Sequence, residues 1–192
     1  RETSLSEQPS VIDANERFIA KQEAELVAAA QKGDKASFHQ LYLQHEKRVF
    51  GLCFRMLANR ESAEDVTQEV FVQVWLKLEN FRGDSKFSTW LHSVATNTVL
   101  SHIRKHKTWL QKVFNIEDQT AIEVEQATSM PELSDLDKLV MKLPERARHV
   151  FVLFAVEGYR HEEIASMLNM AVGSSKAQYH RAKGLLQAWL NE

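Results

Sequence analysis

Apolar residues recur at intervals of three and four along most of this chain, which places them on one face of successive α-helices. The clearest case predicts a long helix over residues 38–56, ended at Asn59-Arg60. Its buried stripe would consist of Phe38, Leu41, Tyr42, His45, Val49, Leu52, Cys53 and Met56. A shorter helix is predicted over residues 23–31 and ends at a Gly33-Asp34 turn. Residues 1–20 show no strong period and are expected to form a flexible tail.

A second pair of helices is predicted on either side of a loop at residues 80–86. The first begins at Glu61 and carries acids in its first turns, where they suit the positive end of the helix dipole. Its apolar residues exceed what one buried stripe needs: Val66, Val70, Phe71, Val72, Val74, Trp75, Leu76 and Leu78. Beside Asp65 and Glu69, this surface fits either docking onto a partner or burial between two neighbouring helices.

The helix after the loop, predicted over residues 87–107, has two faces of different character. One face carries a polar line of Trp90, Asn97, Ser101 and Arg104. The opposite side is apolar and consists of Leu91, Ala95, Thr98 and Val99. The helix ends in the basic run Arg104-Lys105-His106-Lys107. Cations are favoured at any helix C-terminus, so a solvated helix end explains this run without a phosphate ligand.

Residues 113–134 are acidic and aperiodic, and we expect them to form an extended linker between two helical domains. Beyond it, a short helix is predicted over residues 133–142. A turn at Leu143-Pro144 follows, with Pro144 as the first residue of a helix that runs to Val156 and is ended by Gly158.

The C-terminal fifty residues have the pattern of a helix-turn-helix. A short helix over residues 162–168 contains Ala165, which permits close packing, and Asn169 stands where the turn needs a positive φ. The next helix has an inward stripe of Val172, Tyr179, Ala182, Leu186 and Trp189. Its outward and flanking residues are Ser174, Lys176, Gln178, His180, Arg181 and Lys183. Short polar and basic side chains of this kind reach base edges and phosphates, although a purely structural helical hairpin is the alternative.

Composition supports an all-α fold of two small helical domains joined by the acidic linker, because the 192 residues include only three prolines and six glycines. The single cysteine, Cys53, excludes a disulfide within the chain and is expected to be a buried, inert thiol. No apolar run reaches membrane-spanning length and the N-terminus is not signal-like, so a cytoplasmic protein is expected. The net charge of −2 predicts weak DNA binding by the chain alone.

Both modules resemble those of the extracytoplasmic-function (ECF) class of bacterial sigma factors, the promoter-specificity subunits of RNA polymerase. The resemblance covers roughly residues 38–107 and 143–190. It is carried by AEDVTQEVFVQVW, FRGDSKFSTWL, the basic helix around Asn97, LPERARHVFVLFAVEG and VGSSKAQYHRAK, in the family's order. It implies a protein that binds core polymerase, recognises the −35 and −10 promoter elements, melts the −10 region and directs transcription initiation.

The resemblance also implies roles for individual residues. Docking on the clamp helices of the largest polymerase subunit would use Asp65, Gln68, Glu69 and Val72. The pocket that captures an unstacked −10 base would be formed by Phe81, Asp84, Ser85, Lys86 and Phe87, with Trp90 and Asn97 beside it. Nearby backbone phosphates would be held by Arg104, Lys105 and Lys107. The −35 element would be read as duplex by Ser174, Lys176, Gln178, His180, Arg181 and Lys183.

The partners implied are core RNA polymerase (the clamp helices and the flap of the second-largest subunit), promoter DNA and an anti-sigma factor. No small-molecule substrate, cofactor, metal ion or membrane insertion is implied. In similar proteins the linker threads toward the RNA path, where acids mimic nucleic-acid charge; a solvated tether explains the composition almost as well. The acids concerned are Glu117, Asp118, Glu123 and Glu125.

Three positions depart from the family pattern. Ser101 stands where such proteins often have Asp. Ala171 replaces a capping Ser, which costs about 1 kcal/mol of helix stability unless another group substitutes. Ser175 interrupts the inward stripe, where a β-branched apolar residue is usual.

Two other classes of protein compete with this interpretation. An enzyme is disfavoured, because the sequence has no Gly-rich phosphate loop, no nucleophile motif, and no second His to complete a zinc site at His161-Glu162-Glu163. A stand-alone helix-turn-helix regulator accounts for the C-terminal half but leaves residues 61–107 unexplained. Such a regulator would also need more positive charge to bind an operator without polymerase.

Overall fold

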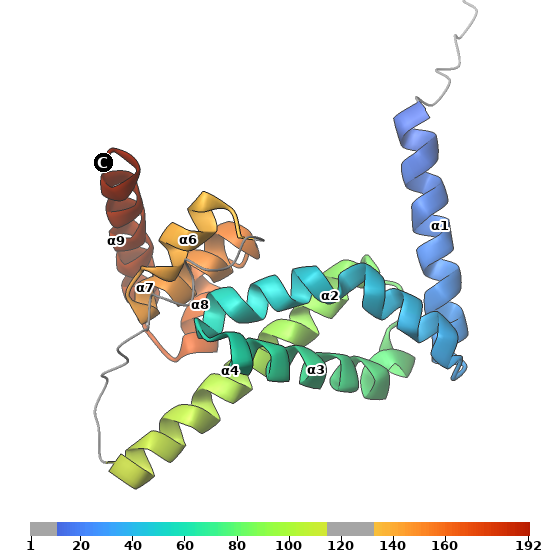
Figure 1. Cartoon of the computed structure of the whole chain (residues 1–192), viewed down its shortest axis with the longest axis horizontal. Coiled ribbons are helices and arrows are strands. Elements are labelled where there is room, and N and C mark those ends of the chain that lie inside the picture. Colours follow the sequence, from blue (N-terminus) through green and yellow to red (C-terminus); the bar gives the residue numbers. More distant parts are fainter. Residues whose placement is uncertain (1–10, 115–132) are drawn as a thin grey trace, which may run out of the picture.

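Helices account for all the regular structure in the computed structural model, which describes residues 11–114 and 133–192 (Figure 1). The all-α fold class expected from the sequence is confirmed. In chain order the elements are α1 (Val11–Gln31), α2 (Lys35–Leu57), α3 (Arg60–Lys77), a 3-10 turn (Leu78–Asn80), α4 (Phe87–Phe114), α6 (Asp135–Met141), α7 (Glu145–Phe151), a π-helical turn (Val152–Val156), α8 (His161–Leu168) and α9 (Val172–Leu190).

Helix α2 is the centre of the N-terminal domain and packs against α1, α3 and α4. Fully buried side chains such as Leu52, Val70 and Leu91 fill the space between these helices. Each contributes about 1.5–3 kcal/mol relative to an exposed position.

Asn59 was expected to end α2, but it is the N-cap of α3, where its side chain accepts a hydrogen bond from the Ser62 amide. The residue that ends α2 is Ala58, in a left-handed conformation with a φ of 53°.

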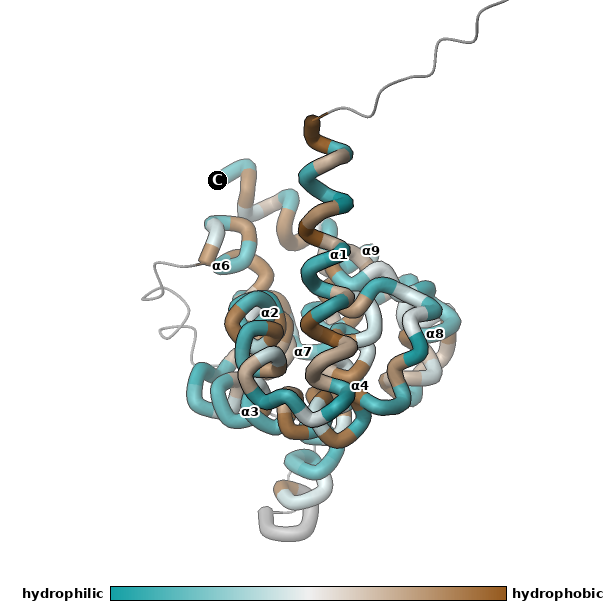
Figure 2. The backbone as a smooth tube through the Cα atoms, turned by 90° about the vertical axis from the view of Figure 1, so that its right-hand side faces the viewer, coloured by the Kyte–Doolittle hydropathy of each residue, from teal (hydrophilic) through white to brown (hydrophobic). Residues whose placement is uncertain are grey.

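The first helix is longer than the sequence pattern indicated. It begins at Val11 rather than at residue 23, so residues 11–20 are helical and the expected flexible tail does not extend through them. Figure 2 shows α1 rising away from the other helices, with hydrophobic residues at its outer end. Val11, Ile12, Phe18 and Ile19 are all exposed. The outer half of α1 packs on little, so its apolar residues obey no burial pattern that would have revealed the helix.

Helix α4 also runs beyond the expected end, to Phe114 instead of residue 107. The predicted acidic linker and its four charge-mimicking acids fall almost entirely within residues 115–132, which lie outside the described residues.

Cys53 is fully buried, as expected, and burial raises the pKa of its thiol to about 11. Among the described residues, no helix combines the length and hydropathy that a membrane span requires.

In the C-terminal domain, α9 packs along α7 and α8. Pro144 is the N-cap of α7 and not its first helical residue, one position earlier than expected. The helix continues through a π-helical turn to Val156, and Gly158, at a φ of 78°, ends it as predicted. The turn between α8 and α9 is confirmed at Asn169, which has a φ of 52°. Ala165 is buried beneath this turn, as close packing of the two helices requires.

Candidate nucleic-acid interface

Three aromatic rings meet where the loop at residues 81–86 joins α4. The ring of Phe81 lies 5.9 Å from that of Phe87 and 5.3 Å from that of Trp90, and the last two are 6.0 Å apart. Phe87 is buried, whereas Phe81 and Trp90 are only partly covered. Helix α1 holds this aromatic corner in place, since the Gln31 side-chain amide donates to the carbonyl of Phe81 at 2.8 Å. The remaining loop residues named from the sequence, Asp84, Ser85 and Lys86, are exposed.

The polar line predicted on α4 is confirmed as a surface. Asn97, Ser101 and Arg104 are exposed. The opposite side is buried and consists of Leu91, Ala95, Thr98 and Val99. Helix α4 therefore presents, in order, a partly covered aromatic corner, an exposed amide and a basic end.

The basic end of α4 is not free of contacts. Arg104 Nη2 donates to the carbonyl of Met167 at 2.6 Å, and Lys107 Nζ lies 4.0 Å from a carboxylate oxygen of Glu145. Both partners belong to the C-terminal domain. Lys105, between them, is exposed. The structure thus separates three residues that the sequence grouped together.

Most of the broad apolar surface on α3 is buried between α2 and α4, including Val66, Val70 and Val74. Trp75 is partly covered by an edge-to-face contact with Phe38, at a ring distance of 4.9 Å. The exposed remainder consists of Val72 and Leu76, with the polar residues Asp65, Gln68 and Glu69 on the same helix. Burial between neighbouring helices therefore explains most of the apolar residues of α3. A small exposed surface of apolar and acidic residues remains, and it is available for docking onto a partner.

Helix α9 exposes most of the residues that the sequence named for reading DNA. They are Ser174, Lys176, His180, Arg181 and Lys183. Gln178 is an exception, because it is half-buried and its Oε1 atom is enclosed without a hydrogen-bond partner in the described structure. Gln178 therefore lies at the edge of the outward face rather than fully on it.

Ser175 was noted as a polar interruption of the inward stripe, and the structure gives it a partner. Its side chain is fully buried, and its Oγ lies 2.9 Å from Nδ1 of His161. The His161 ring is stacked 4.2 Å from that of Phe154. This hydrogen bond joins the first residue of α8 to the first turn of α9. A buried hydroxyl without a partner is costly, so Ser175 and His161 fix the two helices together. The serine at an inward position was the only sequence signal for it.

The missing cap on α9 is also visible. Ala171 has the extended backbone of an N-cap but provides no side-chain hydrogen bond. We expect Ala171→Ser to stabilise the protein by about 1 kcal/mol, because the hydroxyl would accept from an unpaired amide of the first turn. Thermal unfolding followed by circular dichroism should show a rise of about 2–4 °C. Ala177→Ser makes the same chemical change at an exposed position inside α9 and should not raise the melting temperature. Equal shifts in the two variants would contradict the capping explanation.

Sequence reasoning missed two buried residues, Arg148 and His149, which contact the C-terminal end of α2. In the sequence they follow Glu145 and Arg146 in a largely charged segment, so no local signal distinguishes them from solvated residues.

Comparison with known proteins agrees with this geometry. The chain matches the family model "Sigma-70 region 2" over residues 41–108 and "Sigma-70, region 4" over residues 133–186. These two modules, in this order, define a promoter-recognition subunit of the sigma-70 type. The chain is 32% identical over 178 residues to the ECF RNA polymerase sigma factor SigW of Bacillus subtilis, which covers 86% of this chain and 95% of that protein. It is 31% identical to the RNA polymerase sigma-H factor of Pseudomonas aeruginosa, covering 85% and 91% respectively. The chain belongs to the ECF family of RNA polymerase sigma factors.

Solved structures give the same result. The sigma factor RpoE of Bartonella quintana, in complex with the anti-sigma factor NepR, is similar with a TM-score of 0.55 and 25% identity. The match covers 80% of this chain and 96% of that one. CnrH, in complex with the cytosolic domain of CnrY, shares the fold with a TM-score of 0.52 and 24% identity, covering 88% and 97%.

Proposed function

We propose that this sigma factor opens the −10 element at the aromatic corner of Phe81, Phe87 and Trp90, and reads the −35 element with the exposed face of α9. The main support for this proposal is the order of side chains along α4. The partly covered aromatic rings come first, the exposed amide of Asn97 follows, and the basic residues come last. A base that leaves the duplex loses a few kcal/mol of stacking and pairing. Stacking on an aromatic ring supplies about 1–3 kcal/mol of compensation, and an amide can hydrogen-bond to its edge.

Docking on polymerase is assigned to the exposed surface of α3. The carboxylates of Asp65 and Glu69 and the apolar side chain of Val72 combine charge complementarity with a small apolar contact. The net charge of −2 is consistent with a chain that binds promoters only together with polymerase. A chain with so little positive charge gains little affinity from phosphates by itself, so polymerase must provide the rest of the binding.

An anti-sigma factor is the further partner that we propose. The similar RpoE is held by NepR in its solved complex. The exposed Val72 and the partly covered Trp75 on α3 give such a partner an apolar surface next to acids. We place the chain in the cytoplasm, where polymerase and promoters are, and assign no catalytic activity to the chain itself.

Run-off transcription tests the function directly. Purified core polymerase would be supplied with a library of promoter fragments, with and without the chain. We expect start sites that appear only with the chain. They should be lost with Asn97→Ala and with Arg181→Ala, because both substitutions remove exposed polar groups that contact DNA and neither disturbs a core. Tight duplex binding by the chain without any binding to polymerase would instead mean a conventional regulator.

A further inference from the structure

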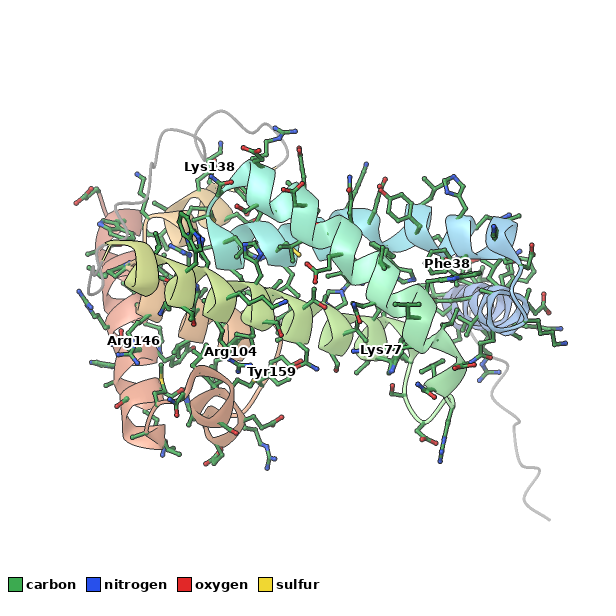
Figure 3. The ribbon with its side chains drawn as sticks, turned by 90° about the horizontal axis from the view of Figure 1, so that it is seen from below. Phe38, Lys77, Arg104, Lys138, Arg146 and Tyr159 are labelled. Atoms are coloured by element: carbon green, nitrogen blue, oxygen red, sulfur yellow. The ribbon has the colours of Figure 1, made fainter. Side chains whose placement is uncertain are left out.

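A cavity of about 650 Å³ is lined by α2, by α4 and by the segment that leads from the π-helical turn into α8. The residues of α2 that line it are Lys47, Arg48, Gly51 and Arg55. Figure 3 shows Tyr159, which belongs to the third wall, beside α4 and close to the start of α8. A cavity of this volume accommodates a small organic molecule.

The α2 wall of this cavity is built around a glycine. Lys47, Gly51 and Arg55 are spaced by four residues, so they share one face of the helix. Glycine inside a helix is less favourable than alanine, and its presence here has a steric reason. A Cβ atom at residue 51 would lie only 3.2 Å from Nη1 of Arg55. The glycine therefore makes room for the guanidinium of Arg55 on the same face as Lys47.

Two side chains that line the cavity have an enclosed nitrogen atom without a protein partner. Nε of Arg55 and Nε2 of His92 form no hydrogen bond with any described residue. The two side chains are only 16% and 17% exposed. Buried polar atoms without a partner are rare because they are costly. An anionic oxygen can accept from the Nε–H group of Arg55, and a ligand hydroxyl can bond to Nε2 of His92.

The cations of this wall suit phosphate groups. Lys47 and Arg48 are exposed at the cavity, whereas Arg55 is largely buried and its Nη1 lies 3.5 Å from a carboxylate oxygen of Asp137. Arginine binds phosphate through a fork of parallel N–H groups, and lysine adds a point charge. Three neighbouring cations therefore favour a ligand that carries more than one negative charge.

The two acids that line the cavity are each engaged with another residue. A carboxylate oxygen of Glu157 lies 3.0 Å from Nδ1 of His92. A carboxylate oxygen of Glu163 accepts from Nε of Arg160 at 2.8 Å. These contacts offset the negative charge of both acids, so the cations of α2 decide which ligand the cavity attracts.

We propose that this cavity binds a small phosphorylated molecule with at least two neighbouring phosphate charges, held by Lys47, Arg48 and Arg55. The uncharged part of the ligand would face Tyr159 and the hydroxyl groups of α4, which are those of Ser88, Thr89 and Ser93. The site uses none of the residues assigned above to polymerase or to promoter DNA. It gives the chain a binding activity for a small molecule in addition to its role in transcription initiation.

Isothermal titration calorimetry of the full chain with pyrophosphate tests the proposal, because this probe has two joined phosphate groups. The titration would be run at about 0.15 M salt, which screens weak surface attraction. Lys47→Gln with Arg48→Gln removes two exposed cations from the cavity. Lys32→Gln with Lys35→Gln removes the same charge at exposed positions elsewhere and is the matched control. We expect saturable binding by the unsubstituted chain and by the control, and a loss of about tenfold or more in the cavity variant.

Gly51→Ala separates binding from folding. Alanine is the better helix former, so the melting temperature should not fall. The added methyl group must displace the guanidinium of Arg55, so the affinity for pyrophosphate should fall severalfold. Undiminished affinity in this variant would count against the proposal, because Arg55 is the cation that is largely buried at the cavity.

Three other results would overturn the proposal. The first is the absence of saturable pyrophosphate binding by the unsubstituted chain, and the second is equal affinity in the cavity variant and its control. The third is displacement of pyrophosphate by a duplex oligonucleotide, since the ligand would then be the backbone of promoter DNA rather than a small molecule. None of these measurements involves polymerase, so their outcome is independent of the run-off assay.

Discussion

Arg148→Met is expected to lower the free energy of unfolding by about 3 kcal/mol, because the buried carbonyls of Arg55 and Met56 would lose a charged donor. Methionine fills much of the same volume, so the loss would come from hydrogen bonds rather than from a cavity. Urea unfolding followed by circular dichroism measures the change. For a chain of this size, the melting temperature should fall by about 6–12 °C.

Arg146→Met is the matched control. Arg146 lies on the same helix, two residues away, and is exposed. Its substitution should change the free energy of unfolding by less than about 0.5 kcal/mol. A loss as large as that of Arg148→Met would mean that α7 needs a charged residue for some other reason. No loss at Arg148 would mean that its buried hydrogen bonds contribute nothing net.

Trp90→Ala is expected to reduce run-off transcripts by roughly ten- to a hundredfold. Stacking of a base on an aromatic ring is worth about 1–3 kcal/mol, and each 1.4 kcal/mol is a factor of ten. The ring of Trp90 is partly exposed and lies 5.3 Å from that of Phe81, so a base could stack at the corner that they form. Permanganate footprinting of unpaired thymines would separate melting from binding, and we expect the reactivity in the −10 element to be lost.

Trp109→Ala makes the same substitution on the same helix, outside the aromatic corner. Trp109 is 54% exposed. Its variant should retain permanganate reactivity in the −10 element. Thermal melts of both variants would exclude loss of folding as the cause. Normal promoter melting by a folded Trp90→Ala chain would contradict the role assigned to the corner.

Local sequence patterns were sufficient for most of the fold. Intervals of three and four located the core faces of α2 and α4, since a helix on a packed domain must bury one side. The left-handed turn at Asn169 and the helix end at Gly158 followed from backbone sterics of single residues. The exposed line through Asn97 and the buried thiol of Cys53 were also predicted, because each depends only on which face of its own helix it occupies.

Hydrophobic periodicity did not predict the structure where a helix makes few contacts with the rest of the protein. It also did not predict hydrogen bonds between polar residues that are distant in sequence. The outer half of α1 has exposed apolar residues and hence no readable face. Ser175 and His161 are fourteen positions apart, and no local rule joins them. Gln178 was placed on the outward face, but the structure leaves it half-buried on the helix that packs against α7 and α8.

The sequence by itself determined the family, through the resemblance of its motifs and their order. It also determined the helices and the face that each helix buries, because these depend on short-range sterics and hydrophobic periodicity. Only the tertiary structure decided that Arg148 and His149 would end α2 from another domain, and that Arg104 and Lys107 would be occupied. Such contacts join residues roughly 40 to 90 positions apart through single hydrogen bonds or ion pairs. Their partners are backbone carbonyls or isolated side chains, which leave no periodic trace in a sequence.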